Sequence, residues 1–397
     1  MGLWISFWIT LLTPLCLGVS HRQDRKNAGG DDALWSIDLR SVGFTGFAPK
    51  KETWGLHLGP DPVCFADNQT VIATFLTREQ VTGLARRDEA IEHSPMRLHA
   101  IFFDSQTGNI RATKDWPLRR PHAGIIAVGD GKFAVLTPSL IALYSLSLEL
   151  LKDLRLSSQQ ESQLWDFRAS PSGKSVVAEY HAPKAYFQWI DMNTLLPRPI
   201  SIPTVVFSIS DEDVVVKRDS YVKPEGFQTD VLIRNADGVW RSVCSVLNGT
   251  NSTCGGTVQF LNNGTLGLVT PHAFSLVPKA GGAPLLQASF RNDEWLDRPL
   301  SPLVEGRRFA VTVWAHHGGS AFFDVDSRSI PKRIEIYDLP NPHPVYAVNA
   351  KQQKISGVSG IALSPDGSLF SILTNGFVRM YKLPDVTPNA QTLSNPH

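Results

Sequence analysis

Short runs of hydrophobic residues, each ended by a tight-turn sequence, recur along most of this chain, and residues 357–384 show the pattern best. Pro365-Asp366-Gly367 and Asn375-Gly376 separate three such runs, and Asp-Gly and Asn-Gly supply the positive φ that short hairpins need. The three runs are residues 361–364, 369–373 and 377–383. A three-stranded meander with one apolar face is not stable alone. The pattern therefore predicts that this unit stacks on copies of itself elsewhere in the chain.

Six further modules follow the same plan, each with three or four strand-like runs. They span residues 62–118, 124–156, 164–202, 204–246, 257–290 and 303–348. An Asp follows an apolar pair at the end of four strand-like runs, at Asp104, Asp191, Asp324 and Asp338. Such an Asp can accept hydrogen bonds from backbone N–H groups of the turn after it. Helical periodicity is scarce, and residues 78–92 are the one good helix candidate.

Seven short-stranded modules of this size predict an all-β fold, a seven-bladed β-propeller. The last module has only three strands, and the isolated strand-like run at residues 33–40 has no hairpin partner beside it. We expect this N-terminal strand to complete the last module and close the ring, which removes an open sheet edge. The propeller would then span residues 33–384, with residues 21–32 as a linker before it and residues 385–397 as a disordered tail.

Two turns carry a resemblance to known propeller families. Ser364-Pro365-Asp366-Gly367 and Ser170-Pro171-Ser172-Gly173 occupy comparable places in their modules. With them the chain resembles the bacterial TolB-like and YVTN-like repeats and the wider WD40-like class, over most of residues 33–384. No Trp-Asp ends a module and no Gly-His opens one, so the eukaryotic WD40 signature is absent. The resemblance implies a fold and leaves the function open.

The composition is that of a folded globular protein, with 42% hydrophobic and 19% charged residues. The formal net charge is +1, so no overall basic excess directs the chain to nucleic acid. Residues 1–20 are uncharged and mostly apolar and precede a polar stretch, which predicts a secretory signal peptide and a secreted or periplasmic protein. No Lys or Arg precedes the apolar segment, so an uncleaved N-terminal anchor in a membrane stays the alternative.

Three cysteines lie beyond residue 20. Cys64 falls in a strand-like run and is expected to be a buried thiol. Cys244 and Cys254 flank a polar loop, and a disulfide between them is plausible in an oxidising compartment. The three do not form a Cys-x-x-Cys metal motif. Glycosylation sequons begin at Asn68, Asn248, Asn251 and Asn263.

The candidate ligand-binding residues are basic, aromatic or imidazole side chains predicted on one face of the propeller. That face carries the loops between second and third strands and the segments between modules. The candidates are Arg119, Arg120, His122, His181, Lys184, Tyr221, His272, His316 and His317. The histidines His181, His272, His316 and His317 are also the candidate metal ligands, provided that they converge on one ion. Each candidate has a plainer interpretation as a solvated or hydrogen-bonded loop residue.

Nucleophile, zinc-protease and phosphate-loop motifs are absent from the sequence. One turn is similar to the Asp-x-x-Thr-Gly sequence of quinoprotein repeats: Asp104-Ser105-Gln106-Thr107-Gly108. Those repeats have Trp where this chain has Ala112, so the resemblance does not support a quinone cofactor, and the cofactor stays unknown. We therefore favour a non-catalytic binding or scaffold module, expected to be a monomer, for a protein, peptide or glycan partner. The alternative is a metal-dependent propeller lyase or hydrolase with His ligands at the mouth of the channel.

Overall fold

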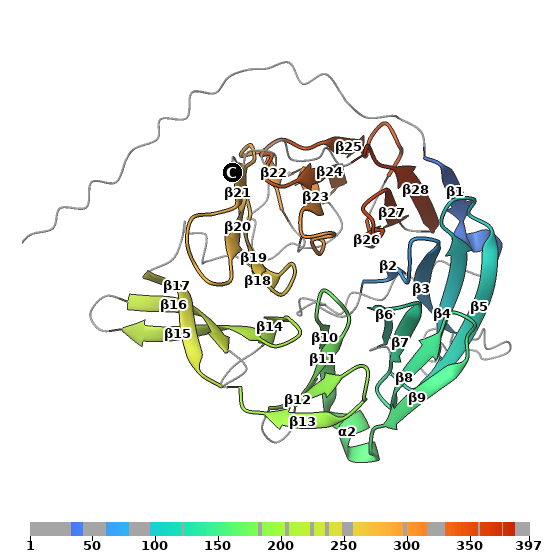
Figure 1. Cartoon of the computed structure of the whole chain (residues 1–397), viewed down its shortest axis with the longest axis horizontal. Coiled ribbons are helices and arrows are strands. Elements are labelled where there is room, and N and C mark those ends of the chain that lie inside the picture. The colour runs from blue at the N-terminus through green and yellow to red at the C-terminus, as the bar shows by residue number, and fades with distance from the viewer. Residues whose placement is uncertain are drawn as a thin grey trace, which may run out of the picture.

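A computed structural model of the 397-residue chain shows seven four-stranded antiparallel sheets arranged in a ring (Figure 1). The residues that the structure describes are 33–42, 61–78, 96–120, 123–181, 185–202, 206–222, 226–234, 238–247, 257–296, 300–315, 330–355, 358–374 and 376–385. The predicted seven-bladed β-propeller is thereby confirmed. No helix in these ranges is long and apolar enough to cross a membrane.

The first strand of each blade lies at the centre of the ring, and the last lies at the rim (Figure 1). Blade 1 is β2 (Val63–Phe65), β3 (Thr70–Arg78), β4 (Met96–Asp104) and β5 (Ile110–Leu118). Blade 2 is β6 (Gly124–Gly129), β7 (Lys132–Leu136), β8 (Leu140–Ser145) and β9 (Leu150–Arg155). The helix α2 (Ser158–Gln163) links it to blade 3, which is β10 (Leu164–Ala169), β11 (Ser175–Tyr180), β12 (Tyr186–Asp191) and β13 (Pro197–Ile200).

The chain continues around the ring in the same order. Blade 4 is β14 (Val206–Ile209), β15 (Val214–Val222), β16 (Gly226–Arg234) and β17 (Trp240–Leu247). Blade 5 is β18 (Thr257–Phe260), β19 (Thr265–Thr270), β20 (Ala273–Pro278) and β21 (Leu286–Ser289). Blade 6 is β22 (Glu294–Trp295), β23 (Arg308–Ala315), β24 (Ile330–Asp338) and β25 (Tyr346–Asn349). Blade 7 contains β26 (Gly360–Leu363), β27 (Leu369–Thr374) and β28 (Phe377–Lys382).

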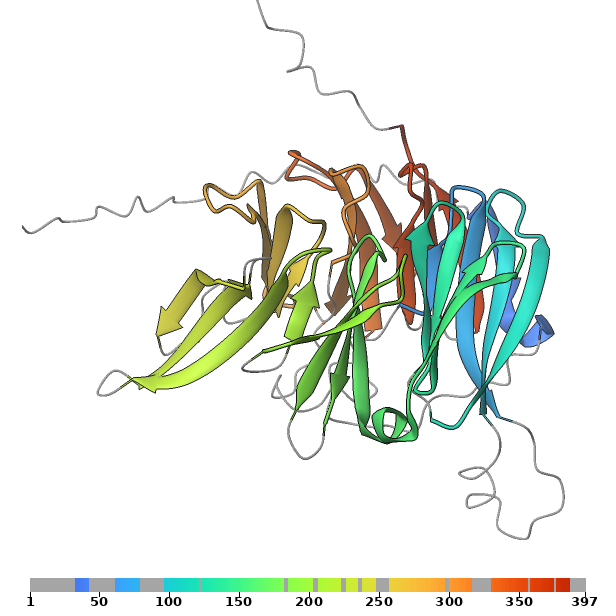
Figure 2. The same cartoon turned by 60° about the horizontal axis from the view of Figure 1, so that its bottom comes forward.

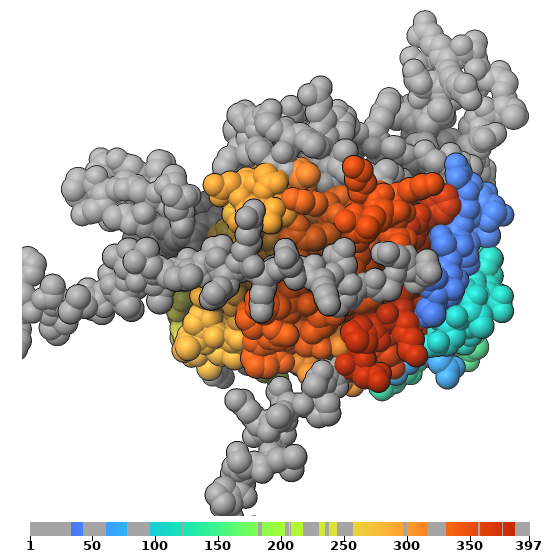
Figure 3. Space-filling model, turned by 90° about the horizontal axis from the view of Figure 1, so that it is seen from above, coloured from blue at the N-terminus to red at the C-terminus, as the bar shows by residue number. Residues whose placement is uncertain are grey.

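The N-terminal strand β1 (Trp35–Asp38) completes blade 7, as predicted. It pairs antiparallel with β28, with Trp35 opposite Met380, and the short 3₁₀ helix η1 (Leu39–Val42) follows it. Figure 3 shows the blue residues of β1 lying against the red last blade at the rim. The indole Nε1 of Trp35 also donates a 2.9 Å hydrogen bond to the carbonyl oxygen of Ser105 in blade 1. The closing strand therefore joins the last blade to the first.

Seven hydrophobic clusters fill the spaces between neighbouring blades, one cluster to each interface. Adjacent residues of one strand pack on opposite neighbours: Phe102 packs toward blade 2, whereas Phe103 packs toward blade 7. In β11 all six residues are buried, with Val176 and Ala178 on the side of blade 2 and Val177 on the side of blade 4. Burial on both faces explains why the central strands are continuous hydrophobic runs.

The strand-end Asp pattern is confirmed in two blades. Asp104 Oδ1 accepts hydrogen bonds from the backbone N–H groups of Gln106 and Thr107, at 3.0 and 2.8 Å. Asp191 Oδ1 does the same for the two backbone N–H groups of its own turn. Asp338 pairs with the side chain of Arg308 instead, and Asp324 lies outside the described residues.

Two expectations need correction. Blade 6 begins at Glu294 and not at residue 303, because its inner strand β22 is only two residues long and residues 296–307 separate it from β23. The helix α2 was not expected, because its six polar residues carry no apolar stripe. The predicted helix at residues 78–92 begins at the last residue of β3, and the rest of it lies outside the described part of the chain.

The cysteine predictions have different outcomes. Cys64 in β2 is a free thiol, but the residue is half-buried and not fully buried. Desolvation, with a smaller contribution from the charge of Asp61, raises the pKa of the Cys64 thiol to about 12, so this thiol is a poor nucleophile at neutral pH. Cys254 lies outside the described residues, as do residues 1–32 and 386–397, so the disulfide, the leader and the tail stay predictions.

Candidate functional site

The ring has two faces, which differ in the chain segments that form them. The connection face carries the second-to-third strand loops and the segments between blades, such as residues 119–120 and 156–163. The turn face carries the other hairpin turns, such as residues 170–174 and 192–196. By this topology Arg119, Arg120, His181 and His272 all lie on the connection face.

Helix α2 gathers two of the predicted residues at the border of blades 2 and 3. Ser157 caps the helix: its hydroxyl accepts from the backbone N–H of Gln160, whose side chain accepts from the backbone N–H of Ser157. Arg120 Nη1 donates a 3.0 Å hydrogen bond to the carbonyl oxygen of Ser162 in this helix. Arg119 Nη1 lies 3.7 Å from Glu161 Oε2, but the Arg119 side chain is 83% exposed. Figure 2 shows the green helix α2 at the lower edge of the ring.

The innermost strand of blade 3 displays a tryptophan beside His181. The pairing of β10 with β11 shifts register between Leu164 and Asp166, so Trp165 has no partner across the strand pair. A β-bulge of this kind redirects the side chain of the unpaired residue. Trp165 is 52% exposed, a large value for a tryptophan in an innermost strand. Its ring stacks on the imidazole of His181, with centroids 4.8 Å apart and planes 10° apart.

His181 is held in place by two further contacts. Its Nε2 donates to Glu179 Oε1 at 2.7 Å, and its backbone N–H donates to the carbonyl oxygen of Gln163 at the end of α2. The Glu179 side chain is only 2% exposed, whereas that of His181 is 43% exposed. The imidazole therefore connects a buried carboxylate to an exposed indole. This arrangement fixes the tautomer and the orientation of the ring.

Buried charges lie behind this pair, on the side of blade 3 that faces blade 4. Glu179 is opposite Asp166 in the strand register, and Asp166 Oδ2 lies 3.1 Å from Arg168 Nη2. Glu179 Oε2 and Arg168 Nε and Nη1 are buried and have no hydrogen-bond partner among the residues that the structure describes. Burying charged groups is costly, and the contacts of Arg168 with Asp166 and of Glu179 with His181 offset part of that cost.

His272 occupies a second polar cluster, between blades 5 and 6. Its Nδ1 donates a 2.6 Å hydrogen bond to the carbonyl oxygen of Glu294 in β22. The Glu294 carboxylate, 5% exposed, pairs with Arg333 Nη1 at 2.5 Å and Lys332 Nζ at 2.8 Å, and Arg333 Nε also pairs with Glu335. Desolvation acts to raise the pKa of Glu294, but the two cations outweigh it and lower the pKa to about 2. These bonds tie β22 to β24, so we interpret the cluster as structural.

The structure thus brings Arg119, Arg120 and His181 together around α2 and places His272 two blades away. His122, Lys184, His316 and His317 lie outside the described residues, and the side chain of Tyr221, a residue of β15, is not described either. In the part of the chain that is described, no three His, Cys, Asp or Glu side chains gather to hold a metal ion. A role for any of the nine residues in ligand binding stays a prediction.

Sequence reasoning missed Trp165, Glu179 and helix α2. The helix had a local signal, because Ser157 and Gln160 have the spacing of a capping box. Trp165 had none, since the bulge that exposes it is a property of strand pairing. Glu179 stands out as the single charged residue in the run at residues 175–180, and a charge in a fully buried strand needs a partner.

No protein-family model and no curated protein matches the sequence. Among the solved structures that resemble the chain is one from the crystal structure of the mitotic checkpoint complex, with 10% identity, 90% of this chain and 96% of that chain covered, and a TM-score of 0.49. Another is the C-terminal WD40 domain of Sif2, with 11% identity, 82% and 97% covered, and a TM-score of 0.44. Both are remote likenesses in fold, and at these TM-scores they carry no information on what the chain binds. The more specific likeness to TolB-like or YVTN-like repeats stays a prediction.

Proposed function

We propose that this chain is a non-catalytic β-propeller that binds a protein or peptide partner on its connection face, with Trp165 at the centre of the contact. The exposed Trp165 ring on the innermost strand carries this proposal. Tryptophan and arginine are the residues most enriched among those that dominate binding energy, and Arg119 and Arg120 lie in the neighbouring segment. Residues 1–20 support a setting outside the cytoplasm, in the periplasm or the medium.

The rigidity of the Trp165 side chain is the second reason. Its ring is stacked on His181, which Glu179 and the end of α2 hold in place. A side chain that is already ordered loses little conformational entropy when a partner covers it. The hydrogen bond from Arg120 to Ser162 holds the Arg120 side chain against helix α2 beside it. Arg119, whose side chain is 83% exposed and makes only a long ion pair with Glu161, can meet an acidic group of the partner.

The test is affinity capture with the full chain from the envelope fraction and the medium of its host, quantified by mass spectrometry. We compare the wild type with Trp165→Ala and with the control Leu196→Ala, whose side chain is 69% exposed on the turn face. We expect a protein or peptide that the wild type and the control retain and Trp165→Ala loses. Titration of that partner should show affinity weakened by about thirtyfold, the effect of a typical hot-spot residue.

Two other results of the capture experiment would change the proposal. A partner that binds Trp165→Ala as tightly as the wild type would place the binding surface elsewhere. If Trp165→Ala loses a captured glycan that the wild type retains, the binding site is correct but the partner is a glycan and not a protein or peptide. Thermal unfolding of each variant checks that the propeller is intact, which we expect because Trp165 is half exposed.

A further inference from the structure

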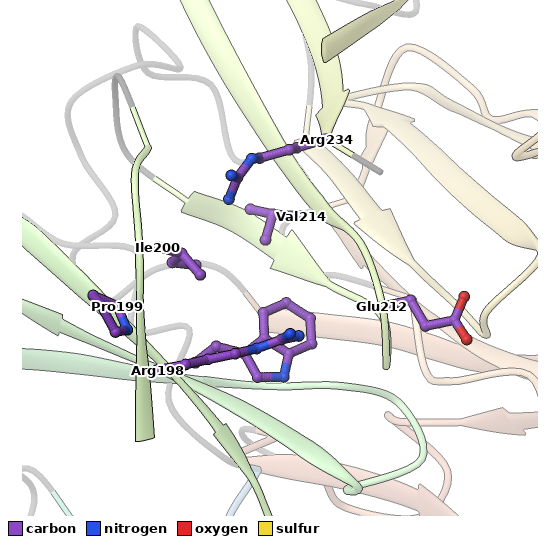
Figure 4. Close-up of a pocket in the computed structure, with 7 residues that line it drawn as sticks. Arg198, Pro199, Ile200, Glu212, Val214 and Arg234 are labelled. Atoms are coloured by element: carbon purple, nitrogen blue, oxygen red, sulfur yellow. The ribbon is translucent and has the colours of Figure 1, made fainter. Parts of the chain in front are cut away.

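A pocket of about 170 Å³ opens between blades 3 and 4, at the turn-face end of the ring (Figure 4). It is remote from Trp165 along the blades, because Arg198 follows the β12–β13 turn and Arg234 ends β16 just before the β16–β17 turn. Trp189, Arg198, Pro199, Ile200, Glu212, Val214 and Arg234 line it. Of the predicted ligand-binding residues whose side chains the structure describes, Arg119, Arg120, His181 and His272, none lines this pocket.

Strand register positions the first arginine. Arg198 in β13 is directly opposite Trp189 in β12, so the two side chains lie on the same face of blade 3. The guanidinium carbon of Arg198 is 5.4 Å from the centroid of the Trp189 ring. Trp189 itself is only 4% exposed and belongs to the cluster between blades 3 and 4. The cation–π contact holds the flat Arg198 side chain against a fixed floor and leaves its N–H groups available.

Strand register also positions the second arginine. Arg234, the last residue of β16, is directly opposite Val214, the first residue of β15. Figure 4 shows Arg234 reaching past Val214 from one side of the pocket, with Arg198 on the other side and Ile200 and Val214 between them. Two guanidinium groups on two different blades therefore line one small space.

The charge of these arginines is not matched within the described part of the chain. Neither Arg198 nor Arg234 has an ion-pair partner there, whereas other arginines nearby, such as Arg168, do. Glu212 also lines the pocket, but it is exposed, and its carboxylate points away from both arginines in Figure 4. The pocket thus presents two positive charges beside a small apolar surface, a combination suited to an anionic group attached to an organic one.

The edge of blade 3 argues against an added β-strand as the occupant. Pro197 and Pro199 alternate along the outermost strand β13 and lack backbone N–H groups. Two of the four residues of β13 therefore have no N–H group to donate, so the edge of this strand has few donors to offer to an added strand. The pocket therefore takes a compact group, such as a side chain or a small molecule.

We propose that this pocket binds a phosphate monoester, with Arg198 and Arg234 on the phosphate oxygens and the organic part against Pro199, Ile200 and Val214. A phosphate monoester carries close to two negative charges at neutral pH, which two guanidinium groups neutralise. A carboxylate carries one and offers fewer acceptor oxygens. The site is separate from the partner surface around Trp165 and does not depend on it.

The experiment is a titration of the full chain with phenyl phosphate, followed by phosphorus NMR line broadening at low ionic strength. Inorganic phosphate is titrated in the same way, and phenylacetate, which contains no phosphorus, is added as a competitor whose affinity is measured by its displacement of phenyl phosphate. We expect phenyl phosphate to bind more tightly than either, because only it has both the double charge and the apolar group. Arg198→Gln and Arg234→Gln should each weaken it about tenfold, the loss expected for one charge-assisted contact. Arg198→Lys should be intermediate, since it keeps the charge without the planar fork.

Two control variants test whether phenyl phosphate binds at this pocket and not at exposed charges elsewhere or at the surface around Trp165. Arg155→Gln removes an arginine that is 87% exposed on β9, the outermost strand of blade 2, and should leave binding unchanged. Trp165→Ala should also leave it unchanged. No broadening with phenyl phosphate, or equal losses in Arg155→Gln and Arg234→Gln, would overturn the proposal. Equal affinity for inorganic phosphate and phenyl phosphate would overturn the assignment to an organic monoester.

Discussion

Arg308 and Asp338 form a two-point ion pair at the border of blades 6 and 7. Arg308 Nε donates to Asp338 Oδ1 at 2.6 Å, and Nη2 donates to Asp338 Oδ2 at 2.7 Å. The remaining Nη1 donates to the carbonyl oxygens of Gly367 and Pro384 in blade 7. Because the Arg308 side chain is only 1% exposed, all these bonds form away from water. One side chain thus joins two strands of blade 6 to the β26–β27 turn and to the segment that follows β28.

Replacement of Arg308 by leucine should strongly destabilise the propeller. The variant leaves the Asp338 carboxylate without its cation and two backbone carbonyls without their donor, and breaking a buried pair typically costs about 3–5 kcal/mol. Urea unfolding at equilibrium measures this loss. The control is Arg307→Leu at the preceding residue, where the side chain is 34% exposed and 3.6 Å from Glu305, and where we expect a loss of about 0.5 kcal/mol. A similar loss of unfolding free energy in the two variants would show that the buried contacts of Arg308 do not stabilise the border of blades 6 and 7.

Gly173→Ala should cost much more than Gly129→Ala, although both glycines have positive φ, at 71° and 85°. A Cβ on Gly173 would lie 1.7 Å from the carbonyl oxygen of Ala127 in blade 2, whereas a Cβ on Gly129 meets nothing within 4 Å. Gly129→Ala therefore reports the backbone strain alone, about 1 kcal/mol. Gly173→Ala adds a collision between the new methyl group and the main chain of blade 2, which only a shift of the two blades can relieve. We expect at least about 2 kcal/mol more by urea unfolding, and equal losses would show that the blades separate easily.

The architecture was predictable because its determinants are local in the sequence. Turns such as Pro365-Asp366-Gly367 mark hairpins, and runs that are buried on both sides mark the strands between them. The closing role of residues 33–40 followed from the three strands of the last module. Blade 6 was misplaced at its start because β22 has only two residues, too few for periodicity to reveal. Its hydrogen bonds depend on β23, which is distant by more than ten residues.

The candidate site was less predictable, because it depends on which loops meet in space. The strand order predicted from the sequence placed His181 and Arg120 on one face, but it could not predict which side chains on that face are in contact. The contact of Arg120 with Ser162 spans 42 residues, and the stacking of Trp165 on His181 depends on a bulge. The pocket at Arg198 and Arg234 joins two blades, and neither arginine belongs to a motif. Convergence of this kind is a property of the folded ring.

Glu294 should make the protein sensitive to acid in a defined pH range. Its pKa is about 2 in the folded chain, below the ordinary value of 4.5, because the hydrogen bonds and charges of Arg333 and Lys332 outweigh desolvation. A carboxyl group with a lowered pKa stabilises the fold fully above its unfolded pKa and loses this effect as the pH falls toward the folded pKa. The wild type should therefore lose up to about 3 kcal/mol from this group between pH 4.5 and pH 2.

Comparison with Glu294→Gln isolates this contribution. The variant should be less stable than the wild type at pH 7 and should show a smaller decline in stability below pH 4.5, as measured by urea unfolding at a series of pH values. Asp293→Asn is the matched control, because its side chain is 65% exposed and lies 3.3 Å from the same Lys332. Parallel pH curves for the wild type and Glu294→Gln would show that other carboxylates govern acid unfolding.

Trp35→Ala should open the ring at its closure before any other blade unfolds. Trp35 donates a hydrogen bond to Ser105, packs 5.8 Å from the Phe103 ring and fills the space above Gly108, so its loss removes these three contacts between β1 and blade 1. We expect a loss of about 2 kcal/mol, less than for a fully buried tryptophan because Trp35 is half-buried.

Hydrogen exchange should then accelerate at the amides of Leu34 and Leu39, which bond to Met380 and Gly376. Trp165→Ala, at an exposed site, should leave these rates unchanged. Uniform acceleration in all seven blades would mean that the ring unfolds as one cooperative unit and that the closing strand is no weaker than the rest.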